Sequence, residues 1–233
     1  MKLLLTNDDG IDAPGLQALS EAVAGLADTV VVAPLLPASG CSHQTTTDSP
    51  IRMAQLAPSR FSVDAKPADC VRVALHQLAP GVECVLAGIN NGGNLGVDVY
   101  YSGTVAAVRE AAIHGLRGIA ISQYHARPLT AEDWPRTTAW TKPLLAELLT
   151  RPWRPGTFWN INLPNPDTVM GDPEVIYCPL DASPLPLSFR REGGSFHYDG
   201  SYSNRPRREG TDVAICFGGK IAVTEITVME MSR

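Results

Sequence analysis

Two adjacent carboxylates stand at the end of the first apolar run of the sequence. Lys2–Thr6 predicts a short buried strand, and Asn, Asp, Asp and Gly follow it at positions 7–10, which include Asp8 and Asp9. Carboxylate oxygens are the ligands that hard divalent cations prefer, and a cation removes the repulsion between neighbouring negative charges. The same four residue types are common turn formers, so an ordinary turn is the alternative. Their position at a strand end favours a metal site.

A second polar loop follows the next predicted strand, Thr29–Ala33. This loop, Pro34–Pro50, is rich in Pro, Ser, Thr and Gly and carries Ser39 next to Gly40. A serine hydroxyl offers an oxygen to a metal or a hydrogen bond to a phosphate, and glycine lets the backbone come close. On composition alone, a turn or cap role for this serine is the more common case.

A third loop is unusually rich in asparagine and glycine. Residues 88–96 hold three asparagines and four glycines, and they follow the predicted strand Glu83–Gly88. Asn90 and Asn94 supply amide oxygens on a flexible backbone, and long loops of this kind inside α/β domains are more often functional than not. The alternative is a flexible, solvated loop.

This third loop ends where a helix is expected to begin. Ser102, Gly103 and Thr104 precede the apolar stripe of a helix predicted over Thr104–Gly115. A helix start offers free N–H groups and the positive end of a dipole, which suit a phosphate. Helix capping explains the same residues equally well. No Gly-Lys-Ser/Thr and no G-x-G-x-x-G pattern is present, so the loop matches neither a P-loop nor a dinucleotide site.

The elements around these loops predict an α/β fold. Strand, helix from Pro14 and strand succeed each other within the first 33 residues, which indicates a βαβ unit and a parallel sheet. Ligands bind beyond the carboxyl ends of such strands, so the three loops are expected to converge. The pattern predicts an α/β core over residues 1–165 and a mostly β extension over 166–233. Further strands are expected at 51–56, 61–65, 118–122, 157–163, 174–178, 188–191, 196–201, 212–217 and 220–228, and helices at 67–78 and 130–149, the last with a kink or break near Pro143.

Composition narrows the function classes. The chain has 233 residues, 44% of them hydrophobic, and a net charge of -5, which argues against a stable complex with nucleic acid. No stretch of about 18 apolar residues indicates a membrane span. The five cysteines are scattered without a C-x-x-C pair, and the first leucines are too few for a signal peptide, so we expect a cytoplasmic protein.

Several motifs, in order along nearly the whole chain, resemble one known family. The chain is similar to the SurE (survival protein E) family in its start, in both polar loops, in the helix start and in a late Gly-Thr-Asp, which are residues 5–15, 32–34 with 39–40, 88–96, 101–107 and 210–212. The resemblance implies a Rossmann-like three-layer core with a mostly parallel sheet and a C-terminal β hairpin. It also implies a metal-dependent phosphatase that hydrolyses nucleoside 5′- and 3′-monophosphates and sometimes short polyphosphate.

Site residues are carried over by motif. We expect one Mg²⁺ or Mn²⁺ per subunit, and in metal-assisted hydrolysis Asp8 or Asp9 would orient or deprotonate the attacking water. The implied metal ligands are Asp8, Asp9, Ser39 and Asn90, and the residues implied around the phosphate are Asn94, Ser102, Gly103 and Thr104. It further implies a homodimer or homotetramer, and residues 187–205 predict an exposed hairpin that contacts another subunit.

The sequence departs from the family pattern in two places, and two other functions are alternatives to a phosphatase. Relatives often carry arginines where this chain has Leu35, Leu36 and Pro37, and Gly-Thr-Pro where it has Ala65-Lys66-Pro67. One rival function is a serine hydrolase with Ser39 or Ser102 as the nucleophile, although no G-x-S-x-G elbow is present. The other is a nucleotide-binding module without catalysis, because a fold does not imply a function.

Overall fold

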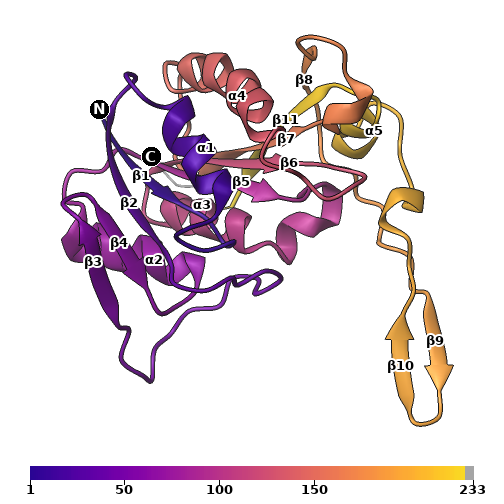
Figure 1. Cartoon of the computed structure of the whole chain (residues 1–233), viewed down its shortest axis with the longest axis horizontal. Coiled ribbons are helices and arrows are strands. Elements are labelled where there is room, and N and C mark those ends of the chain that lie inside the picture. Colours follow the sequence, from indigo (N-terminus) through magenta and orange to yellow (C-terminus); the bar gives the residue numbers. More distant parts are fainter. Residues whose placement is uncertain (229–233) are drawn as a thin grey trace.

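A nine-stranded, mostly parallel sheet forms the centre of the computed structural model, which describes residues 1–228 (Figure 1). Its strand order is β3-β4-β2-β1-β5-β6-β7-β11-β8, and only the β3–β4 and β7–β11 pairs are antiparallel. The strands of this sheet are β1 (Lys2–Thr6), β2 (Asp28–Pro34), β3 (Met53–Ala57), β4 (Arg60–Val63), β5 (Cys84–Asn91), β6 (Arg117–Gln123), β7 (Thr157–Leu163), β8 (Val175–Tyr177) and β11 (Ile221–Thr227).

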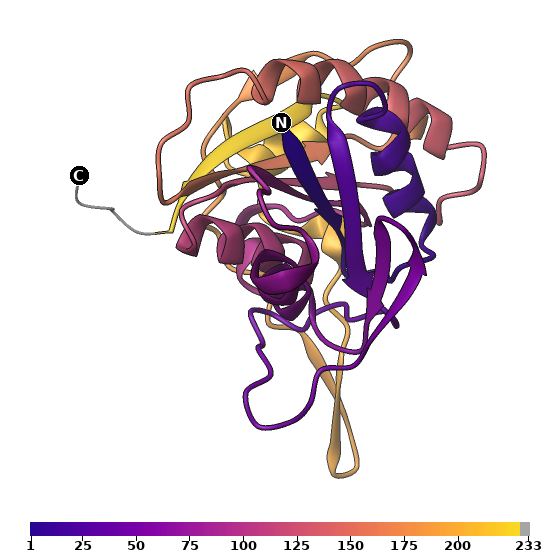
Figure 2. The same ribbon diagram turned by 90° about the vertical axis from the view of Figure 1, so that its left-hand side faces the viewer.

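Helices cover both faces of the sheet and make a three-layer architecture. Helices α1 and α4 pack on one face, and α2 and α3 pack on the other (Figures 1 and 2). The α-helices are α1 (Pro14–Ala22), α2 (Pro67–Val73), α3 (Gly103–Ile113), α4 (Trp134–Leu148) and α5 (Asp212–Phe217), and the shorter helical turns are Ala74–Leu78, Gly96–Tyr100, Pro166–Thr168 and Tyr202–Asn204. No helix within residues 1–228 is long and apolar enough to cross a membrane.

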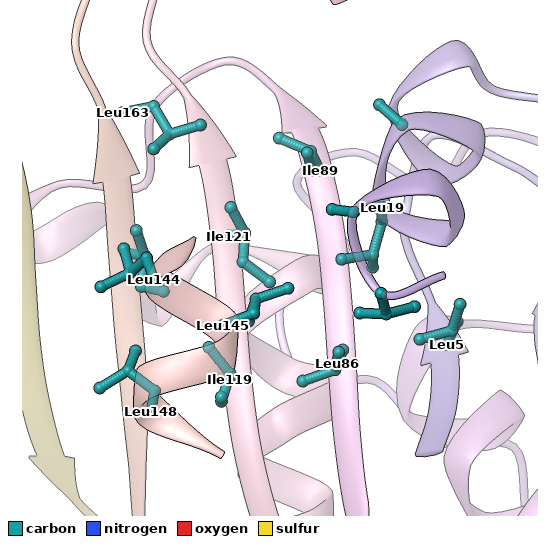
Figure 3. Close-up of a cluster of buried hydrophobic side chains, with 14 of the residues drawn as sticks. Leu5, Leu19, Leu86, Ile89, Ile119, Ile121, Leu144, Leu145, Leu148 and Leu163 are labelled. Atoms are coloured by element: carbon teal, nitrogen blue, oxygen red, sulfur yellow. The ribbon is translucent and has the colours of Figure 1, made fainter. Parts of the chain in front are cut away.

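The alternation of side chains along β1 explains why both faces are covered. Leu3 and Leu5 belong to the apolar cluster that α1 and α4 complete, whereas Leu4 belongs to the cluster under α2 and α3. All three leucines are fully buried. Figure 3 shows the first cluster, in which Leu5 and Leu86 from neighbouring strands lie beside Leu19 of α1. Burial of each such side chain contributes about 1.5–3 kcal/mol, so β1 is fixed at the centre of the fold.

The start of α1 lies in direct contact with the end of β5. A Cβ atom on Gly15 would lie 1.9 Å from the carbonyl oxygen of Ile89, a separation that only glycine avoids. Pro14 occupies the first turn of the helix, where its missing N–H costs nothing. The first turn of α1 is therefore packed directly against the backbone of β5 near its carboxyl end.

The structure corrects one predicted element. Residues 212–217 were expected to form a strand because Val, Ile, Cys and Phe favour β structure, and they form helix α5 instead. The carboxylate of Asp212 accepts the N–H of Val213 at 2.9 Å and also bonds to two distant backbone N–H groups, so tertiary contacts override local propensity. Helix α4 runs through Pro143 from Trp134 to Leu148 in one assigned piece, so no break occurs there.

The residues after β7 contribute to two different places. Strands β8 and β11 extend the central sheet beyond β7. Strands β9 (Phe189–Glu192) and β10 (Ser195–Tyr198) form a separate antiparallel hairpin, which confirms the two strands expected in this region. All eight of their residues are exposed. The hairpin projects from the body of the molecule in both perpendicular views (Figures 1 and 2).

Candidate functional site

The three polar loops meet at the carboxyl edge of the sheet. Strand β1 lies between β2 and β5, so the loops that follow these three parallel strands leave the sheet side by side. The N–H of Ala38 donates to the carbonyl oxygen of Asp8 at 2.7 Å, and the N–H of Asn91 donates to Asp9 Oδ2 at 3.0 Å. These two hydrogen bonds tie the second and third loops to the carboxylate pair.

Asp8 is buried and held in one orientation. Its side chain is 4% exposed, and Thr104 Oγ1 donates to its Oδ1 at 2.5 Å. A Cβ on Gly103 would lie 2.9 Å from Asp8 Cβ and 3.0 Å from Asp8 Oδ2, so a glycine at this position lets the start of α3 approach the carboxylate. The structure thus brings Asp8, Gly103 and Thr104 into direct contact.

Both carboxyl groups lie in surroundings that oppose their negative charge. Burial is the main cause that raises the pKa of Asp8 to about 6; the neighbouring Asp9 adds to the increase, and the hydrogen bond from Thr104 opposes it. Burial likewise raises the pKa of Asp9, against the hydrogen bond from Asn91. Within residues 1–228 neither carboxylate forms an ion pair with a lysine, arginine or histidine. A bound cation would supply the positive charge that these two groups lack.

The donor atoms suit a hard cation. Asn90 Nδ2 donates to Gly92 O at 2.7 Å, which leaves Asn90 Oδ1 as a free acceptor. Ser39 is exposed and directly follows Ala38, the residue bonded to Asp8. No group of three or more His, Cys, Asp and Glu side chains that could hold a metal occurs in the described part of the chain. Two carboxylates completed by neutral oxygens match Mg²⁺ or Mn²⁺ better than a zinc site.

Asn94 is placed in the third loop with its side chain turned towards the sheet. Its Nδ2 donates to Ser122 Oγ at 2.8 Å, and its N–H donates to Asn162 Oδ1 at 2.8 Å. Asn160 and Asn162 both donate to the carbonyl oxygen of Asn94. The side-chain amide of Asn94 therefore fixes the loop on β6, and its main-chain N–H and C=O fix it on β7.

Ser102 acts as the N-cap of α3. Its Oγ accepts the N–H of Val105 at 3.0 Å, as expected for a serine at this position. Within residues 1–228 neither Ser102 nor Ser39 hydrogen-bonds to a histidine. The nearby His43 bonds to Glu110 instead, at 2.8 Å. The geometry gives no Ser–His pair for a serine nucleophile.

Sequence reasoning missed the residues that hold the third loop. The alternation Asn160-Ile161-Asn162 places both amides on the same face of β7, and that period of two is the signal that could have indicated them. The contacts of Asp98 with Arg205 and of Gly96 with Asp212 join residues more than 100 positions apart. No local pattern indicates such pairs.

Comparison with known proteins gives consistent matches over the chain. The family "Survival protein SurE" matches residues 3–178. A protein of a Nostoc species, named as a candidate 5′-nucleotidase, is 49% identical over 98% of this chain and all of its own length. The protein named 5′-nucleotidase SurE from Allorhizobium ampelinum is 37% identical over 97% of this chain and 91% of its own. The crystal structure of the SurE protein from Aquifex aeolicus superposes with a TM-score of 0.84 at 29% identity, covering all of this chain and 95% of that one.

Proposed function

The chain belongs to the SurE family, and on that premise we propose that it is a 5′-nucleotidase that hydrolyses nucleoside monophosphates to a nucleoside and phosphate. The observation that carries the proposal is the pair of carboxylates at the end of β1, which lies against the start of α3 and between two polar loops. The reaction is inferred from the names of the relatives. The chain's own residues provide carboxylates, amide and hydroxyl oxygens and a helix N-terminus, which are the groups that phosphate-ester hydrolysis uses.

We assign a divalent cation, Mg²⁺ or Mn²⁺, to Asp8, Asp9, Ser39 and Asn90. The fit rests on the buried carboxylate of Asp8, on the half-buried carboxylate of Asp9 and on the free amide oxygen of Asn90. Neither carboxylate has a cationic partner within residues 1–228. Bound there, such a cation polarises a phosphoryl oxygen and lowers the pKa of a water molecule.

The protein's own groups orient the reaction. Hydrogen bonds from Thr104 and Asn91 each occupy one oxygen of Asp8 and of Asp9, so each carboxylate keeps one oxygen without that restraint. One of these two oxygens orients the attacking water and accepts its proton. Backbone N–H groups at the start of α3, around Gly103, lie at the positive end of the helix dipole and suit the phosphoryl oxygens.

The surroundings favour small monoesters over longer anionic substrates. Leu35 and Leu36 follow β2 and are exposed beside the site, where a cationic side chain would otherwise attract additional phosphates. We therefore expect nucleoside monophosphates to be the main substrates. Activity on short polyphosphate is expected to be weaker, since its additional phosphates call for further positive charge. Nucleoside 3′-monophosphates carry the same charge as 5′-monophosphates, so we expect this loop to leave activity on them unaffected.

We also propose a homo-oligomer that forms through the β9–β10 hairpin. Leu187, Phe189, Phe196 and Tyr198 are between 53% and 90% exposed on an arm that projects from the body. A two-stranded hairpin is only marginally stable by itself in water, so contacts with another copy would supply the burial that it lacks.

All five cysteines are free, which fits a reducing cytoplasm.

A substrate panel tests the activity. Purified protein is incubated with 5′- and 3′-nucleoside monophosphates, a nucleoside triphosphate, short polyphosphate and a simple phosphate ester, each with Mg²⁺, Mn²⁺ or a chelator. We expect phosphate release from 5′-monophosphates with metal and none after chelation. Binding of nucleotides without any turnover would favour a non-catalytic module instead.

A further inference from the structure

The part of the third loop nearest α3 is held from outside by the C-terminal segment. Asp98 lies in the helical turn Gly96–Tyr100, and its Oδ2 accepts hydrogen bonds from Arg205 Nη1 at 2.5 Å and from Tyr202 Oη at 2.7 Å. Arg205 Nη2 also donates to the carbonyl oxygen of Leu95 at 3.0 Å. One guanidinium therefore joins Leu95, the residue before the turn, to Asp98 in its middle.

The main chain of Asp98 also hydrogen-bonds to the residues just before α3. Its carbonyl oxygen accepts the N–H of Tyr101 at 2.9 Å and the N–H of Ser102 at 3.0 Å. Ser102 is the N-cap of α3, and the next two residues of the helix contact Asp8. A continuous series of contacts thus runs from Arg205 through Asp98 and Ser102 to the carboxylate.

The two charged side chains at the start of this series of contacts, Arg205 and Asp98, are both largely buried. The side chain of Arg205 is 2% exposed and that of Asp98 is 12% exposed. Removal of one partner of a buried ion pair strongly destabilises the folded protein, because the remaining buried charge has no opposite charge beside it. A planar guanidinium can bond to a carboxylate and a carbonyl at the same time, which a lysine ammonium does less well. The arrangement therefore depends on the shape of the arginine as well as on its charge.

We propose that Arg205 is a positioning residue for the proposed phosphatase site, acting through Asp98 on the start of α3. It does not reach the carboxylates itself. It sets the conformation of residues 95–102, and through Ser102 it sets the distance of the α3 N–H groups from Asp8. The kinetic part of this inference rests on the proposed function, whereas the structural part does not.

Hydrogen exchange of the backbone amides tests the structural part without using activity. In Arg205→Gln we expect the amides of residues 95–102 to exchange ~10-fold faster or more, with β5 and β6 unchanged. Arg205→Lys should lie between this variant and the wild type. The matched control is Arg207→Gln, since Arg207 lies on the same segment, stacks on Phe217 and donates to Ser203 O without contacting the loop.

Kinetics test the functional part. Arg205→Gln should raise KM or lower kcat for a nucleoside monophosphate by ~10-fold, and Arg207→Gln should change neither by more than about 2-fold. If Arg205→Gln is poorly folded, the double variant Asp98→Asn with Arg205→Gln removes the uncompensated charge. It should fold and keep both the faster loop exchange and the kinetic defect.

Two results would overturn the inference. One is equal exchange of residues 95–102 in Arg205→Gln and Arg207→Gln. The other is a loosening that spreads equally over β5 and β6, which indicates a purely global effect. A wild-type protein that releases no phosphate with any metal refutes the proposed function, and the exchange data still decide the role of Arg205.

Discussion

The polar side chains at the end of β1 are held by residues from distant parts of the same protomer. The side chains of the β9–β10 hairpin, by contrast, are exposed and have few contacts with the rest of the protomer. Asp8 is 4% exposed and bonded to Thr104, 96 positions later. Phe196 is 67% exposed, and the guanidinium carbon of Arg191 on the neighbouring strand lies 5.8 Å from the centre of its ring. The first region is thus largely buried within one chain, whereas the second stays exposed in the single chain.

Because of this difference in burial, we expect substitutions in the two regions to change different properties of the protein. Changes at the carboxyl edge of the sheet should alter chemistry or folding of the single chain. Changes on the hairpin should leave the single chain intact and alter only its association.

Removal of one carboxylate charge should have the largest effect. Asp8→Asn and Asp9→Asn keep the size of the side chain but remove charge that water cannot replace. We expect phosphate release to fall by roughly 10³-fold at fixed metal concentration. The melting temperature without metal should not fall, because a buried uncompensated charge is removed. A variant with more than about one tenth of the wild-type rate would contradict the assignment.

Glycine substitutions compare packing in the two regions. A Cβ on Gly15 would lie 1.9 Å from Ile89 O, so Gly15→Ala must displace α1 or β5, and we expect a loss of about 3 kcal/mol in the free energy of unfolding. Gly194→Ala in the hairpin is the control, since no heavy atom lies within 4 Å of the added Cβ. It should change stability by less than about 0.5 kcal/mol. Urea denaturation measures both, and equal losses would refute the comparison.

The two serines should respond differently to metal. Ser39→Ala removes the neutral ligand that we propose for the metal, which water can partly replace, and Ser102→Ala removes the cap of α3. Both should lower the rate by roughly 10–100-fold. A higher Mn²⁺ concentration should partly restore Ser39→Ala and not Ser102→Ala. Trapping of a phosphoserine at either position during turnover would instead support a serine nucleophile.

Deletion of the hairpin should have the smallest effect on the single chain. The N–H of Asp199 donates to Ser188 O at 3.0 Å, so residues 189–198 can be removed and these two ends joined. We expect a lower mass in solution by light scattering and little change in the stability of the dissociated chain. Phe196→Ser should weaken association in the same direction. An unchanged mass after the deletion would show that the hairpin does not hold the subunits together.

Local patterns predicted the elements near the site because those elements are defined by local residues. The apolar run of β1, Pro14 at the start of α1 and the cap Ser102 each follow from a few neighbouring side chains. Helix α5 was mispredicted because Asp212 is held by Gly96 and by residue 181, which local sequence does not show. The roles of Arg205 and of the asparagines on β7 depend on the same kind of long-range contact.

Calorimetric titration with Mn²⁺ tests whether Asp8 and Asp9 together bind the divalent cation that the proposed reaction needs. Wild-type protein should bind one Mn²⁺ per chain, and phosphate release from a nucleoside 5′-monophosphate should saturate over the same range of Mn²⁺ concentration. Asp8→Asn and Asp9→Asn should show no such binding, while Phe196→Ser should bind as the wild type does. Equal Mn²⁺ affinity in wild type and in Asp8→Asn would show that Asp8 is not a metal ligand.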